Sequence, residues 1–62
     1  MFKIKVNGMT DTFVRRCVDG FDISDYENSM LIESHEELEL VLEELADENY
    51  SFISDTTVIT TV

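Results

Sequence analysis

Apolar and polar residues alternate at the start of the chain. Phe2, Ile4 and Val6 are separated by Lys3 and Lys5. Successive side chains of a β-strand point to opposite faces, so this pattern predicts a half-buried strand. Its two lysines are expected to face away from the core.

The next segments are assigned from composition and turn residues. Residues 12–18 (TFVRRCV) are rich in β-branched and aromatic residues, which favour a second strand, although a short helix is the alternative. The Asn7-Gly8 pair favours a turn, so the two strands are expected to form a hairpin. Residues 19–29 have the composition of a loop, and residues 29–33 (SMLIE) are either a connection or a third strand.

An amphipathic helix is predicted at residues 35–48. Ser34 is a suitable N-cap, and Glu37 stands at the position of its capping-box partner. Asn49 is a residue type that can end a helix. Four apolar residues recur at i, i+3, i+4 and i+7 and form one stripe that is expected to face the core: Leu38, Val41, Leu42 and Leu45.

The C-terminal residues 50–62 return to β-branched and aromatic side chains. They form either one long strand or a hairpin that turns near Ser54 and Asp55. The predicted order is β-β-(β)-α-β. This order corresponds to an α+β fold, in which a small antiparallel sheet of three to four strands carries one helix on one face. The 62 residues form a single small acidic domain.

Charge is the most unusual property of this sequence. The chain has 14 acidic and 4 basic residues and a net charge of −10, while its 44% apolar content is ordinary for a folded protein. Such a charge attracts basic partners and argues against direct binding to nucleic acid or to an anionic membrane. The four bases all lie in the first 16 residues, where they can offset only part of the acidic surface.

The residue types that carry catalysis or metal binding are scarce. His35 is the only histidine, and the sequence HEELE lacks the second histidine of a zinc-protease helix. Cys17 has no cysteine partner, so we expect a small buried side chain and a reducing, cytoplasmic location. The aspartates between residues 19 and 25 lack the calcium-loop pattern. We therefore expect no catalytic site, no metal and no cofactor.

The predicted helix is unusually acidic. It carries seven carboxylates and no lysine or arginine. Five pairs of acids stand three or four residues apart, and together they oppose the helix by about 1–2 kcal/mol. The acids of the last turns also lie at the negative end of the helix dipole, where cations are favoured. Helix stability therefore does not explain these charges.

Two interpretations of the acidic helix remain. The charges are either a solvated face that aids solubility or a binding surface for a basic partner. Seven charges over about 20 Å give about one per 3 Å, which is close to the phosphate spacing of one DNA strand. Leu40, which lies opposite the core stripe, is a lone exposed apolar residue in either case. The candidate partner-binding residues are Glu36, Glu39, Glu43, Glu44, Asp47 and Glu48, with Asp19, Asp22 and Asp25 as secondary candidates.

These features favour a non-enzymatic binding protein. Its acidic surface is expected to mimic DNA and to occupy a nucleic-acid-binding site on a basic protein. Its size, acidity and lack of catalytic residues are similar to those of the small inhibitors that bacteriophages make, which would place it in the host cytoplasm. The alternative is a structural module that self-associates through sheet edges, such as a homodimer, because the C-terminal TTVITTV is uncharged and has high β-propensity.

Overall fold

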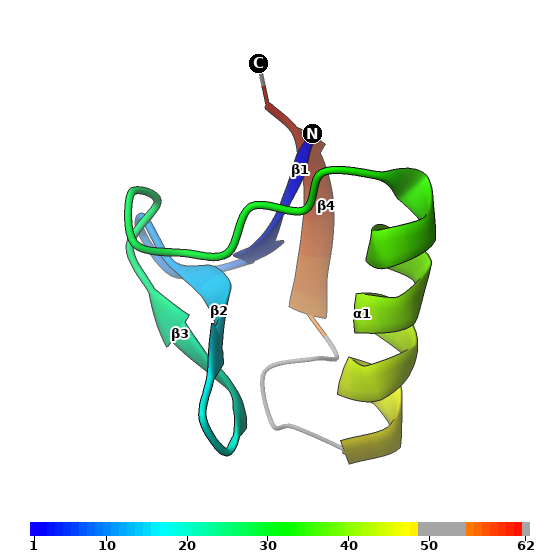
Figure 1. The fold of residues 1–62 in the computed structure, drawn as a ribbon. Coiled ribbons are helices and arrows are strands. Elements are labelled where there is room, and N and C mark those ends of the chain that lie inside the picture. Colours follow the sequence, from blue (N-terminus) through cyan, green and yellow to red (C-terminus); the bar gives the residue numbers. More distant parts are fainter. Residues whose placement is uncertain (49–54, 62) are drawn as a thin grey trace.

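The computed structural model describes residues 1–48 and 55–61 and contains one antiparallel sheet and one helix (Figure 1). The predicted α+β class and the β-β-(β)-α-β order are both confirmed. The strand order in the sheet is β3-β2-β1-β4. The five elements are β1 (Phe2–Val6), β2 (Phe13–Cys17), β3 (Gly20–Ser24), α1 (His35–Glu48) and β4 (Thr56–Thr60).

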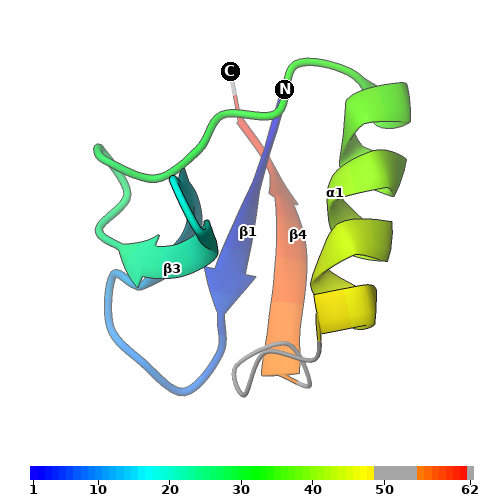
Figure 2. The ribbon, with the colours of Figure 1, turned by 60° about the horizontal axis from the view of Figure 1, so that its bottom comes forward.

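The first and last strands of the chain are neighbours in this sheet. β1 pairs with β4 along its whole length, and Ile4 lies opposite Val58 in the register. Figure 2 shows these two strands side by side, with α1 running along them. The predicted first strand is therefore confirmed, and residues 56–60 of the predicted C-terminal β segment form a strand. Residues 49–54 lie outside the described residues, so the expected helix end at Asn49 and the turn near Ser54 are not addressed.

The third strand lies in a segment that was predicted to be a loop. The loop prediction for residues 19–29 is wrong at its start, because Gly20–Ser24 forms β3 and pairs with β2 from Cys17↔Gly20 onwards. Only Val18 and Asp19 connect the two strands. Gly20 has φ 132°, a backbone conformation that residues with a side chain rarely adopt. Glycine therefore allows the chain to enter β3 directly after this short connection.

Residues 29–33 do not form the strand that was considered for them. Ile32 makes a single antiparallel bridge to Phe2, with N···O distances of 2.7 and 2.8 Å. The amide of Met30 donates to the carbonyl of Val14 at 3.2 Å. This segment thus bonds to β1 on one side and to β2 on the other. The ladder between β1 and β2 themselves consists of one pair, Lys5↔Phe13. It closes the sheet where β1 and β2 separate.

The hydrophobic core lies between α1 and one face of the sheet, which we call the inner face. Ile4 and Val14 point into it from the sheet, and Val41 and Leu45 are its buried contributions from α1. Ile32 completes the set of fully buried residues. The other two residues of the predicted helix stripe, Leu38 and Leu42, are partly buried and pack against this core. The predicted core-facing stripe is therefore confirmed.

The start of α1 is fixed by the predicted cap. The Ser34 hydroxyl accepts a hydrogen bond from the Glu37 amide at 3.2 Å, which satisfies one of the free amides of the first turn. The Glu37 carboxylate accepts from the amide of Glu33 at 3.3 Å. In a capping box it would accept from the Ser34 amide, so the reciprocal bond is displaced by one residue.

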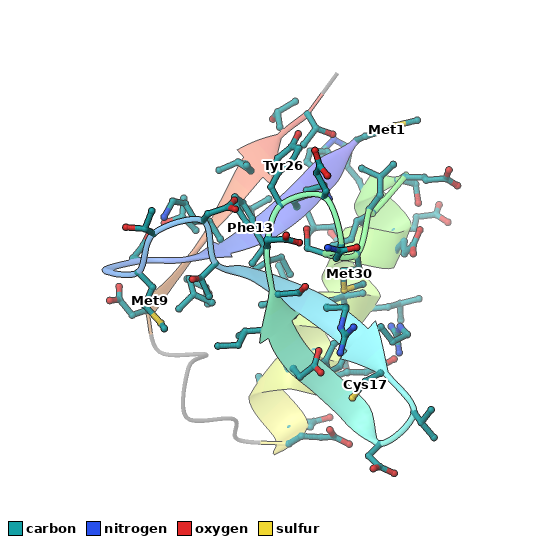
Figure 3. All side chains as sticks on the ribbon, turned by 90° about the vertical axis from the view of Figure 1, so that its left-hand side faces the viewer. Met1, Met9, Phe13, Cys17, Tyr26 and Met30 are labelled. Carbon is teal, nitrogen blue, oxygen red and sulfur yellow. The ribbon has the colours of Figure 1, made fainter. Side chains whose placement is uncertain are left out.

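The opposite, outer face of the sheet is partly covered by residues 25–31. Lys3 points to this face, as the alternation predicts, but it is only 6% exposed. Its ammonium group donates to Ser29 Oγ at 2.8 Å, and the Tyr26 ring lies edge-on to Phe13 with centroids 5.2 Å apart. Figure 3 shows Phe13 and Tyr26 beside one another. Lys3 therefore faces away from the core as predicted, and it is buried because this segment folds back over β1.

Candidate interaction surface on the acidic helix

Four of the seven acidic side chains of α1 lie on the side of the helix that faces away from the sheet. At about 100° per residue, Glu36, Glu43 and Asp47 fall within about 40° of one another and nearly opposite Leu45. Glu39 lies about 40° to one side of this row. All four carboxylate side chains are exposed. We call the surface formed by Glu36, Glu39, Glu43 and Asp47 the acidic ridge.

An exposed leucine lies beside the acidic ridge. Leu40 is 61% exposed and stands between Glu36 and Glu43 along the helix. Neighbouring residues on this face are acidic, so Leu40 has no apolar patch around it on α1. It offers a single apolar contact within a negatively charged surface.

The basic residues of the chain do not neutralise the acidic ridge. Lys3 is buried under residues 25–31, and Lys5 donates to the carbonyl of Met9 at 3.3 Å. The two arginines form the ion pairs found among the described residues: Arg15 with Asp22 at 2.6 Å and Arg16 with Glu44 at 3.3 Å. The ridge carboxylates therefore face solvent without a cation from residues 1–48 or 55–61.

Glu44 has a different environment from the ridge. It contacts Arg16 of β2, whose guanidinium carbon lies 4.8 Å from the centre of the Phe21 ring. Phe21 is itself buried in the core. This arrangement links the helix flank to β2 and β3. Although Glu44 was predicted to bind a partner, its position also gives it an intramolecular role.

The remaining candidate acids are spread over the molecule. Glu48 is exposed in the last turn of α1, and Asp19 is exposed in the β2–β3 connection. Figure 1 places this connection and the C-terminal end of α1 at the same end of the fold. Asp25 directly follows β3, an edge strand of the sheet, and accepts two hydrogen bonds from Asn28 at 3.0 and 2.7 Å.

Asp22 lies on the outer face of the sheet. Its two carboxylate oxygens accept from Nε and Nη2 of Arg15 at 2.9 and 2.6 Å, a bidentate arrangement across β2 and β3. These hydrogen bonds, together with the positive charge, hold the pKa of Asp22 below its usual range and raise the pKa of Arg15. The structure therefore does not bring Asp22 and Asp25 together with the acidic ridge.

The single histidine and the single cysteine are not part of the acidic ridge. His35 is exposed at the first position of α1, and its ring contacts Phe2 with centroids 4.8 Å apart. Cys17 was expected to be buried but is only partly so, because it ends β2 and points to the outer face. Among the described residues there is no pocket and no group of three potential metal ligands.

Comparisons of this chain with known protein families, curated proteins and solved structures found no match. In residues 1–48 and 55–61, no helix has the length and apolar character needed to cross a membrane.

Proposed function

We propose that this protein is a non-enzymatic binding protein whose acidic ridge mimics DNA and occupies a nucleic-acid-binding site on a basic protein. The observation that carries this proposal is the combination of four exposed carboxylates on one side of α1 with no cation to pair them among the described residues. Each of these carboxylates remains available for a cation supplied by another molecule.

The energetics of α1 support a role outside folding. Glu36–Glu39, Glu39–Glu43 and Glu43–Asp47 are like-charge pairs three or four residues apart. Each pair costs the helix about 0.2–0.5 kcal/mol. Asp47 also opposes the helix dipole, because it is an acid in the last turn of α1, where the dipole is negative. The last turn contains no basic residue that would offset it. A basic partner would remove this repulsion on binding.

The shape of the acidic ridge fits a groove that accepts a nucleic-acid backbone. From Glu36 to Asp47 the helix rises about 16 Å, with Glu36, Glu43 and Asp47 in a nearly straight row and Glu39 to one side of it. The lysine and arginine side chains that bind phosphates also bind carboxylates, and arginine does so with two parallel hydrogen bonds. Leu40 would add one apolar contact beside these charges.

The proposed setting is the cytoplasm of a bacterial host, with the protein acting as a small inhibitor of the phage type. The support is compositional: 62 residues, a net charge of −10 and a single cysteine. A protein with this charge would associate rapidly with a basic target, because opposite charges steer the encounter.

Capture from a bacterial lysate tests the proposal. The immobilised protein is compared with two variants that each lose two charges: Glu39→Gln with Glu43→Gln on the acidic ridge, and Glu27→Gln with Glu33→Gln, which are not part of it. All four glutamates are exposed. Each variant loses two carboxylates, so the two variants carry the same net charge. The proposal expects a basic nucleic-acid-binding protein to be retained by the wild type and by the second variant, and to be lost from the first. Equal retention by all three would show that the position of the ridge charges is irrelevant.

A further inference from the structure

The direction of the main-chain groups in β4 follows from two hydrogen bonds at its ends. The amide of Thr61 donates to the carbonyl of Met1 at 2.8 Å, and the amide of Asn7 donates to the carbonyl of Asp55 at 2.9 Å. Hydrogen-bonded and non-hydrogen-bonded pairs alternate along an antiparallel ladder. In this register, the odd-numbered residues of β4 therefore bond to β1, and the even-numbered residues do not.

Val58 and Thr60 consequently direct their amides and carbonyls away from β1. β4 is the last strand of the sheet, so these groups lie along an open edge. No hydrogen bond joins the main chain of either residue to a part of the described structure beyond β1. Both side chains are exposed, with Val58 at 38%. This edge can accept a further strand.

The β4 edge lacks the features that usually prevent strand addition. Proteins protect edge strands with charged side chains, proline or bulges. The five residues of β4 are TTVIT, all β-branched and uncharged, and each pairs with β1 without a bulge. The other edge strand, β3, carries Asp22 and begins with Gly20, which makes it a poorer template.

We infer that β4 pairs antiparallel with β4 of a second copy of this chain, which joins two sheets into one. The edge is self-complementary: a two-fold axis at Val58 places Val58 opposite its copy and Thr56 opposite Thr60. Thr57 and Ile59 then face one another on the outer face. Threonine pairs and pairs of β-branched residues stabilise neighbouring strands. Val58 and Thr60 of each copy would direct their main-chain amides and carbonyls toward the added strand.

Charge sets the conditions under which this dimer forms. The two-fold axis is perpendicular to the sheet, so both copies of α1 lie on the same side of the joined sheet. Each chain carries a net charge of −10, and the uncharged β4 is where two such molecules can approach most closely. Salt screens the remaining repulsion, so dimerisation is strengthened by salt. Binding of the acidic ridge to a basic partner has the opposite dependence, and the dimer does not rest on that function.

Sedimentation of the full chain over a range of concentrations, at low and high salt, tests the dimer. We expect a monomer–dimer equilibrium that shifts toward the dimer at high salt. Thr60→Pro removes an outward amide that β1 does not use, so it should abolish the dimer while the fold is retained. Thr60→Val keeps that amide and the β-branched shape, and should dimerise like the wild type. A strict monomer at millimolar concentration and high salt would overturn the inference.

Amide hydrogen exchange of the unaltered chain gives a second readout that does not depend on how Thr60→Pro folds. The amides of Thr57 and Ile59 bond to β1 and should be protected at all concentrations. The amides of Val58 and Thr60 should become protected only as concentration rises. Fast exchange at Val58 and Thr60 in concentrated samples would contradict pairing through this edge, even if the protein dimerised by another surface.

Discussion

The ammonium group of Lys3 lies 4.5 Å from the centre of the Tyr26 ring and donates a hydrogen bond to the main-chain carbonyl of the same residue. The ammonium group also donates to the carbonyl and hydroxyl of Ser29 at 3.2 and 2.8 Å. A buried cation is costly unless its donors are satisfied, and here three oxygens and one aromatic ring provide that environment. Lys3 therefore fastens residues 25–31 to β1, although the two segments are distant in sequence.

Lys3→Met tests this connection because methionine keeps most of the side-chain length but has no donors. The carbonyl of Ser29 would lose its partner in a buried position, so unfolding free energy should fall by about 1–3 kcal/mol. Lys5→Met on the same strand is the control, and it should change stability by less than about 0.5 kcal/mol. Urea unfolding of both variants gives the comparison. Equal effects would mean that the hydrogen bonds of Lys3 contribute nothing specific.

The packing of α1 predicts an order among its leucines. Leu45 is 0% exposed, Leu42 is partly buried and Leu40 is 61% exposed. Leu45→Ala should cost about 2–5 kcal/mol, enough to unfold a domain of this size. Leu42→Ala should cost less, and Leu40→Ala should stay within about 0.5 kcal/mol of the wild type. Thermal melts of the three variants test this order, and a large loss at Leu40 would reverse the assigned faces of α1.

The Arg15–Asp22 pair predicts a local acid titration. Hydrogen bonds from Arg15 lower the pKa of Asp22 from its ordinary value of 3.8, so this link is fully present above that pH. The link is lost as the pH falls through the lower pKa of the folded state. In a carboxyl-carbon NMR titration, the midpoint of Asp22 should lie below the ordinary value of 3.8, and Arg15→Gln should raise it. An Asp22 midpoint that is unchanged in the variant would show that the bidentate pair is absent in solution.

Local sequence patterns were sufficient to predict the elements that have one clearly apolar face. β1 was predicted from its strict alternation and α1 from its cap and its four apolar residues. β3 was missed because Gly20 and its aspartates resemble a loop, although Phe21 and Ile23 do alternate with Asp22. In an edge strand that alternation is compatible with an outward aspartate, here paired with Arg15 across the sheet.

Tertiary contacts explain what the sequence did not predict about the surface. The exposure of the acidic ridge was predicted from the helix period alone. The burial of Lys3 depends on a segment more than twenty residues away, which no local pattern contains. The pairing of Arg16 with Glu44 likewise depends on how α1 lies against β2. The ion pair with Arg16 separates Glu44 from the ridge, and Asp22 is likewise held by Arg15 on the outer face of the sheet.

Neutralising the acidic ridge should stabilise the fold. Glu39→Gln with Glu43→Gln removes three like-charge pairs from α1, each worth about 0.2–0.5 kcal/mol at low salt. The unfolding free energy should therefore rise by up to about 1.5 kcal/mol, and the gain should shrink at high salt. Glu27→Gln with Glu33→Gln should give a smaller change. Chemical unfolding at two salt concentrations provides the measurement, and a destabilised ridge variant would mean that these carboxylates serve the fold.

The salt dependence of complex formation tests the central claim most directly. The affinity of the captured basic protein is measured at two salt concentrations for the wild type, the ridge variant and the Glu27/Glu33 control, with duplex DNA as competitor. We predict that wild-type binding weakens as salt rises, that DNA displaces the protein, and that the ridge variant binds more weakly with a flatter salt dependence. Binding by the ridge variant that equals the wild type at both salts, or a complex that DNA does not displace, would contradict the claim that the acidic ridge mimics DNA.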